Sequence, residues 1–442
     1  MSQSATINAS SARSAIETST IRTISWRLIP FLILAYFLAY LDRVNLGFAA
    51  LTMNADLKFS PLVFAWGAGI FFIGYFIFEV PSNLALEKFG ASRWIARIMV
   101  TWGVISALMA AVSGETSFYI LRFLLGVAEA GFFPGIILYL SYWFPARQRA
   151  TATSLFMAAA PLSTVLGSPL SSALLEMNGV WGLKGWQWMF LLEALPAVVL
   201  GFVVLAYMTD RPEQAKWLAD DERAWLSETM NAERAAKAAT SGHSIWKGLA
   251  DPRVLALALV YFGTSAGLYT LGVWAPQIIK GFGLSNMAVG FLNAVPPTVA
   301  VIAMYLWSWH SDKTNERTWH VVLACLAAAI GLALAGLSST VVSVVAALVL
   351  VNVGISAAKP PLWSMPTLFL SGPAAAAGIA TINSIGNLGG FFGPAMIGWI
   401  KDQTGSFAGG LWFVAGLLIL SAVLTLVLAR SATRSAAVVN AQ

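Results

Sequence analysis

Long apolar segments recur along nearly the whole of this 442-residue chain, and they constrain its fold more than any other feature. Hydrophobic residues make up 58% of the sequence and charged residues only 10%, against about 25% charged residues in soluble domains. A helix needs about 20 mostly apolar residues to cross a bilayer, whereas a transmembrane barrel shows shorter, alternating segments. We therefore predict an all-α polytopic membrane protein. The twelve predicted spans are 27–50, 62–85, 95–113, 118–140, 151–174, 187–208, 253–276, 287–309, 319–337, 342–368, 375–400 and 409–429.

The basic residues predict the orientation of these spans. With both termini in the cytoplasm, the inner side of the membrane, span ends included, holds 19 of the 26 Lys and Arg residues. The outer loops hold four, and three more lie well inside spans. This bias follows the positive-inside rule. We expect an inner-membrane location with both termini cytoplasmic, and the net charge of +6 then reflects topology rather than nucleic-acid binding.

The spans divide into two sets of six around the longest polar stretch. We predict a cytoplasmic tail at 1–26, a six-helix bundle at 27–208, a cytoplasmic linker at 209–252, a second six-helix bundle at 253–430 and a cytoplasmic tail at 431–442. The loop after the second span of each half is similar, with the sequences NLALEKFGASR at 83–93 and SWHSDKTNER at 308–317. Such internal repeats are typical of transporters in which two pseudo-symmetric bundles rock about a central site.

Charged residues inside the apolar segments are the clearest functional signal. Asp42 and Arg43 lie in the middle of the first segment, where each charge costs roughly 2.5–3.5 kcal/mol. Arg122 and Glu129 are seven residues apart, so they project from one helix face about 10.5 Å apart along its axis. We expect all four to face the protein interior. They either handle ions during transport or form permanent structural ion pairs.

Lys359 is the only basic residue well inside the spans of the second half, and Pro360 and Pro361 follow it. Arg43 on one bundle and Lys359 on the other are predicted to grip an anion with two carboxylates between them. Alternatively, Lys359 snorkels or binds carbonyl groups that the prolines leave free.

Twelve spans in a 6+6 layout, with a similar loop in both halves, resemble the major facilitator superfamily over nearly the whole chain. Four segments resemble the anion:cation symporter family, and specifically its branch of tartrate, phthalate and hydroxyphenylacetate carriers. They are YLDRVN at 40–45, GYFIFEVPSN at 74–83, LRFLLGVAEAGFFPG at 121–135 and NSIGNLGGFFGP at 383–394.

The resemblance implies roles for the buried charges. Asp42 and Glu129 are predicted to couple protons, because a carboxylate whose arginine partner is drawn away to a substrate can switch its protonation. Arg43 and Arg122 are predicted to bind a carboxylate, which matches the two-donor fork of a guanidinium. Arg122 has the alternative role of orienting Glu129.

Uncharged candidates complete the predicted binding site. Tyr40 and Tyr75 match positions that line the pockets of related sugar-acid carriers. Asn383 and Asn387, one helical turn apart, are candidates for hydrogen bonds to substrate, with helix packing as the alternative. Ala160 aligns with a glutamine of sugar-acid carriers, which favours a smaller or more aromatic acid.

The repeated loops are predicted to gate the bundles, although they depart from the superfamily pattern Gly-x-x-x-Asp-Arg/Lys-x-Gly. Asn83 and Glu87 replace the Gly and Asp of the first copy, and Ser308 replaces the Gly of the second. An acid remains in both copies, so a salt bridge to the neighbouring bundle is expected. The predicted gating residues are Glu87, Lys88, Arg93, Asp312, Lys313 and Arg317.

We therefore expect a proton-coupled importer of a small organic anion, best matched by a tartrate-like dicarboxylate, that works as a monomer. Symport of aromatic carboxylates is the alternative, followed by export or antiport. The sequence shows no nucleophile, nucleotide or metal motif, and its single cysteine, Cys325, excludes an intrachain disulfide. We expect no enzyme activity, no cofactor and no metal. Glu79 and Glu193 are interpreted as structural.

Overall fold

The computed structural model describes residues 2–239, 251–366 and 372–439, and every regular element within them is helical. The predicted all-α fold class is therefore confirmed. The longer helices are α1 (Ser2–Leu57), α2 (Pro61–Phe89), α3 (Ala91–Leu108), α4 (Glu115–Glu129), α5 (Phe132–Trp143), α6 (Ala146–Met157), α7 (Ala159–Leu175), α8 (Gly185–Tyr207), α9 (Asp220–Ala239), α11 (Pro252–Lys280), α12 (Asn286–Thr314), α13 (Thr318–Leu337), α14 (Val341–Ser364), α15 (Gly372–Asn387), α16 (Gly389–Thr404) and α17 (Ala408–Val439).

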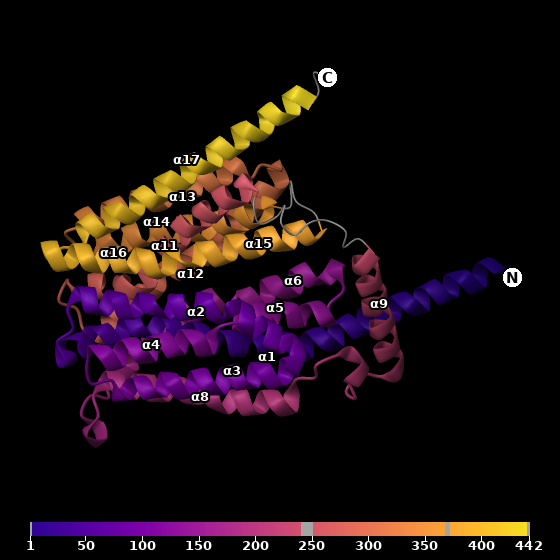
Figure 1. Ribbon diagram of the computed structural model, residues 1–442, viewed down its shortest axis with the longest axis horizontal. Helices are drawn as coiled ribbons and strands as arrows, with labels where there is room; N and C mark the ends of the chain where they lie inside the picture. The colour runs from indigo at the N-terminus through magenta and orange to yellow at the C-terminus, as the bar shows by residue number, and fades with distance from the viewer. Residues whose placement is uncertain (1, 240–250, 367–371, 440–442) are drawn as a thin grey trace.

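Within the described residues, 11 helical segments are long and apolar enough to cross a membrane. The predicted span 375–400 is not among them; it is divided between α15 and α16, which are 16 residues each. The two helices meet at Leu388 and run end to end (Figure 1). The glycine pair after Leu388 explains the break, since glycine is a poor helix former. Helix α1 begins at Ser2, so helix also occupies the predicted N-terminal tail.

The helices form two bundles, α1 to α8 and α11 to α17, which lie one above the other in Figure 1. Both chain termini and α9 lie at one end of the molecule, which we call the terminal end; the opposite end is the far end. The bundles contact each other through α1 with α11, α2 with α16 and α7 with α12.

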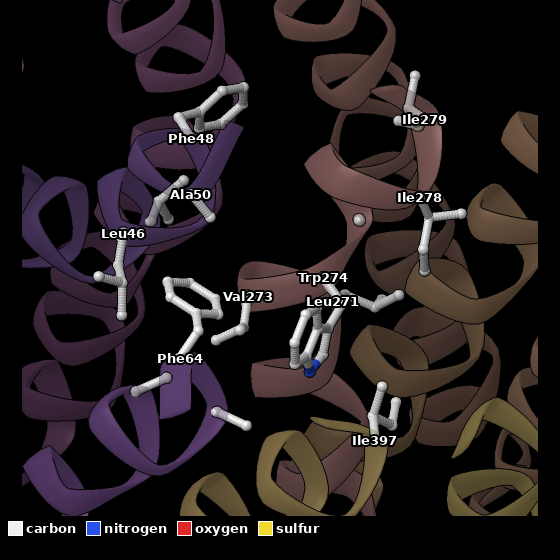
Figure 2. Packing of buried hydrophobic residues seen from close by; sticks show 14 of the residues in the cluster. Leu46, Phe48, Ala50, Phe64, Leu271, Val273, Trp274, Ile278, Ile279 and Ile397 are labelled. Atoms are coloured by element: carbon white, nitrogen blue, oxygen red, sulfur yellow. The ribbon is translucent and has the colours of Figure 1, made fainter. Parts of the chain in front are cut away.

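Buried apolar side chains show which end of the molecule is closed. One cluster, the far-end cluster, takes residues from both bundles, including Leu46, Phe48 and Phe64 from the first and Leu271, Trp274 and Ile397 from the second (Figure 2). Of the other two clusters, nearer the terminal end, one takes its buried members from the first bundle and the segment 208–230 that follows it, and the other from the second bundle. Apolar burial therefore joins the bundles at the far end, while each bundle has a separate core towards the terminal end.

Backbone packing also closes the far end. A Cβ at Gly47 of α1 would lie 2.3 Å from the carbonyl oxygen of Gly272 on α11, so only glycine allows these helices to come so close. Many large apolar side chains on the outside are exposed, such as Phe202 and Ile302, as expected for a surface that faces lipid.

Candidate functional site

The site is built around Arg43, in the last third of α1, and Glu129, the last residue of α4. Arg43 donates hydrogen bonds to the same oxygen, Oε1 of Glu129, from Nε at 2.8 Å and from Nη2. The Glu129 side chain is 1% exposed and that of Arg43 is 14% exposed. The two predicted residues are therefore brought together as an ion pair within the first bundle.

Glu129 lies at a break within the predicted span 118–140. Ala130 leaves the helical conformation and Gly131 adopts a positive φ of 85°, before α5 resumes at Phe132. A Cβ at Gly131 would also lie 2.3 Å from the Ser82 hydroxyl oxygen, so glycine is required there. Breaks of this kind within membrane helices are typical of binding sites, because they leave backbone polar groups free beside the site.

Arg43 also reaches the second bundle. Its Nη1 donates a 3.3 Å hydrogen bond to the hydroxyl of Tyr269 on α11. The guanidinium carbon lies 5.2 Å from the centre of the Tyr75 ring and 5.4 Å from that of Phe71. Arg43 is therefore positioned between the bundles, within an aromatic environment that favours a cation. Sequence reasoning identified Tyr75 but missed Tyr269, which no charge or motif marks.

Asp42 points to a different set of partners, although it is adjacent to Arg43 in sequence. It is 5% exposed, and its Oδ1 accepts hydrogen bonds from Ser106 of α3 and, at 3.4 Å, from Asn45 of α1. Its Oδ2 has no partner among the described residues. The adjacent pair thus separates into an arginine that faces the other bundle and an acid buried within its own bundle.

Arg122 bonds backbone groups within its own bundle. Its guanidinium donates to the backbone carbonyls of Gly67 and Ala68 on α2, at 3.1 and 3.4 Å, and the residue is 4% exposed. It neither bonds Glu129 nor reaches the interface between the bundles in the described contacts. The arrangement holds α2 against α4.

One second-bundle candidate, Asn383, makes a second contact between the bundles. Asn383 of α15 donates a 3.1 Å hydrogen bond to Oε1 of Glu79 on α2. Lys359 on α14 is partly exposed, and no ion pair or hydrogen bond of its side chain is found within the described part of the chain. Asn387 is likewise partly exposed, at the end of α15. Tyr40 lies beside Tyr36, with ring centres 6.0 Å apart.

The predicted gating residues lie at the terminal end. Arg317 pairs with Asp312 of its own loop at 2.6 Å, and Lys313 lies over the Trp309 ring. Glu87, Lys88 and Arg93 are exposed, and among the described residues no ion pair joins them to the second bundle. The predicted salt bridge between the bundles is therefore not formed among the described residues in this structure, in which the apolar cluster shared by both bundles lies at the far end.

The described residues contain no group of three or more His, Cys, Asp or Glu side chains that could hold a metal ion. The polar side chains at the contacts between the bundles are instead the guanidinium of Arg43 with the phenol of Tyr269, and the amide of Asn383 with the carboxylate of Glu79. Cations and hydrogen-bond donors of this kind suit an anionic organic molecule.

The chain is similar to known proteins over most of its length. Residues 32–394 match the family described as "Major Facilitator Superfamily". Two proteins of Agrobacterium vitis named "Putative tartrate transporter" are similar in sequence. One is 73% identical over 417 residues, covering 94% of this chain and 96% of that protein. The other is 71% identical over 420 residues, covering 95% and 93%.

A solved structure has the same fold. It is a bacterial homologue of the human lysosomal transporter Spinster in an inward-facing, unoccupied conformation, with a TM-score of 0.75 and 15% identity, covering 92% of this chain and 97% of that chain. The family match spans both bundles and the sequence identity to the Agrobacterium proteins is high. The chain therefore belongs to the major facilitator superfamily, as a multi-pass membrane transporter and not an enzyme.

Proposed function

We propose that this protein imports a tartrate-like dicarboxylate together with protons across the bacterial inner membrane, as a monomer with both termini cytoplasmic. The observation that carries the proposal is the position of Arg43, which is bonded to Glu129 in one bundle and to Tyr269 in the other. The names of the Agrobacterium relatives, at 71–73% identity, support tartrate as the best-matched substrate.

Substrate binding is assigned to Arg43 and Lys359. The planar fork of Arg43 matches one carboxylate, and the ammonium of Lys359 provides a point charge for the other. Counted from the far ends of α1 and α14, Arg43 lies about 21 Å and Lys359 about 27 Å along its helix, at a rise of 1.5 Å per residue. The two cations thus lie at similar depths on opposite bundles, as a clamp on a short dicarboxylate requires. Asn383 and Asn387 are proposed to bind hydroxyl groups.

Proton coupling is assigned to Glu129 and Asp42. Arg43 cannot give its full donor fork to Glu129 and to a substrate carboxylate at once. Substrate binding therefore removes the ion-pair partner of Glu129, and a buried carboxylate without a cation favours its protonated form. Binding of the anion and of a proton support each other, which is the requirement for symport.

The transport cycle is proposed to rock the two bundles, 27–208 and 253–430, about this site. Sealing at the far end, with separate cores towards the terminal end, corresponds to an inward-open state if the termini are cytoplasmic. In the outward-open state the far-end cluster would separate. The loops with Glu87, Lys88 and Arg93 and with Asp312, Lys313 and Arg317 would then close the terminal end.

The proposal is tested by uptake of radiolabelled tartrate into proteoliposomes with an acid exterior. The proteoliposomes are expected to accumulate tartrate only when the proton gradient is present, and Arg43→Gln is expected to abolish this accumulation. Arg430→Gln is the matched control, because Arg430 is exposed near the end of α17. Accumulation of tartrate without any proton gradient, or unchanged uptake by Arg43→Gln, would contradict the proposal.

Aromatic carboxylates are the second candidate, because Phe71, Tyr75 and Tyr269 lie around Arg43. Rings in this arrangement can stack on an aromatic acid. Competition for tartrate uptake by phthalate and hydroxyphenylacetate decides between the two. A stronger effect of the aromatic acids than of unlabelled tartrate would favour this second substrate class.

A further inference from the structure

A second buried acid lies on the far-end side of Asp42. Glu193 of α8 is 5% exposed, and its Oε1 accepts a 2.7 Å hydrogen bond from the Ser171 hydroxyl of α7. Its Oε2 has no partner among the described residues. No arginine or lysine pairs with this carboxylate in the described ion pairs. A membrane-embedded acid of this kind is a candidate for ion or proton handling.

Asn45 lies close to both Asp42 and Glu193. Its amide nitrogen donates to Oδ1 of Asp42 at 3.4 Å, whereas no hydrogen bond joins it to the Glu193 carboxylate among the described contacts. Asn45 is 0% exposed, and its Oδ1 has no partner among the described residues. Asp42 and Asn45 of α1 and Glu193 of α8 therefore each have one side-chain oxygen without a partner among the described residues. This is unusual, because most buried polar groups are hydrogen-bonded.

These groups are arranged in order along the membrane normal. Counted from the far ends of their helices at 1.5 Å per residue, Asp42 lies about 22 Å deep, Asn45 about 18 Å, Glu193 about 12 Å and Ser171 about 6 Å. The series leads from the central site towards the far end, which is outside the cell in the proposed orientation. Arg43 and Glu129 lie on the other side of Asp42, at about its depth.

We propose that Glu193 and Asp42 form one proton-binding pair, in which Glu193 receives the proton from the far-end side and Asp42 takes it up next. In this step an O–H bond at the Glu193 carboxyl breaks and one forms at the Asp42 carboxylate. The pair is enclosed by Ser171 from α7, Asn45 from α1 and Ser106 from α3, and the cations that act on Asp42 are Arg122 of α4 and Arg43 of α1. The inference rests on the proposed proton symport, to which it adds the entry site.

The test compares two transport assays for Glu193→Gln, which keeps an acceptor for Ser171 but cannot carry the proton. Proton-driven uptake of tartrate is expected to fall at least about tenfold, whereas counterflow of tartrate, which needs no net proton movement, stays close to wild type. The number of protons taken up per tartrate, measured with a pH-sensitive dye, is expected to fall. Glu176→Gln, at an exposed acid next to α7, is the matched control.

Glu193→Asp separates proton binding from packing, because it shortens the side chain but retains the carboxyl. Proton-driven uptake that recovers in Glu193→Asp supports the inference. Equal loss of uptake and counterflow in both variants would mean that Glu193 is structural and would overturn it. Wild-type uptake and proton count in Glu193→Gln would overturn the inference alone, whereas proton-independent accumulation by the wild type would remove the proposed function as well.

Discussion

Arg43 directs two of its nitrogens, Nε and Nη2, to a single oxygen of Glu129, Oε1. The other oxygen, Oε2, is buried and has no partner among the described residues. The third guanidinium nitrogen bonds Tyr269 of the opposite bundle instead. The ion pair is therefore one-sided, and a competing carboxylate can replace it without breaking any further contact of Glu129.

Glu129→Gln is expected to free Arg43 permanently. Tartrate binding by the purified protein should then lose most of its dependence on pH, while proton-driven accumulation is abolished and counterflow remains. The reason is that the neutral amide cannot compete for the guanidinium or exchange a proton. Isothermal titration calorimetry between pH 5 and pH 8 measures this. Binding by Glu129→Gln that keeps the wild-type pH profile would assign coupling to another residue.

Lys359→Gln is expected to weaken binding of dicarboxylates selectively. Loss of a charge-assisted hydrogen bond of about 1.5–3 kcal/mol corresponds to roughly a 10- to 150-fold higher Kd for tartrate. A monocarboxylate that uses only Arg43 should bind wild type and variant almost equally. Thermal-shift titration with both ligands checks this, with Lys216→Gln as an exposed-lysine control. An equal loss for both ligands would argue against a two-cation clamp.

Gly47→Ala is expected to open the far end. Its Cβ would lie 2.3 Å from the Gly272 carbonyl oxygen, and a backbone atom cannot move aside as a side chain can. In a Cys325→Ala background, a cysteine placed at Ser172, in the buried far-end region, should react faster with a thiol reagent when Gly47→Ala is present. Gly416→Ala is the control, since no atom lies within 4 Å of the added Cβ.

Arg122→Gln is expected to reduce stability rather than change substrate affinity. Its guanidinium bonds two carbonyls that join α2 to α4, and charged hydrogen bonds of this kind contribute about 1.5–3 kcal/mol. The melting temperature in detergent should fall while the KM for tartrate stays near wild type. A large rise in KM without a change in melting temperature would restore the predicted substrate-binding role.

Glu316 should make the start of α13 sensitive to acid. Partial burial alone would raise the pKa of Glu316, but hydrogen bonds from the backbone of Trp319 and from the His320 side chain outweigh it and lower the pKa below its usual 4.5. Such a group stabilises the fold fully above pH 4.5, and this contribution is lost as the pH falls through the lowered pKa. Melting temperatures measured from pH 7 to pH 3 should show a smaller decline for Glu316→Gln than for wild type.

Apolar periodicity predicted the helices well because crossing a bilayer requires long apolar segments whatever their neighbours are. It failed where one span contains two helices. The break after Glu129 depends on Gly131 at positive φ and the break at Leu388 on a glycine pair, and both depend on packing against other helices, although Gly131 and Pro134 were visible signals. The same limit explains why Asp42 and Arg43, neighbours in sequence, have different partners.

The sequence by itself determined the membrane class and which charged residues lie within apolar segments, because both follow from the free energy of moving a residue type into lipid. Only the tertiary structure decided which charges meet. Arg43 with Glu129 and Tyr269, Glu79 with Asn383, and Asp42 with Ser106 all join residues according to how helices pack. Most of these contacts link residues far apart in the chain, so their partners depend on helix rotation and tilt, which local sequence does not specify.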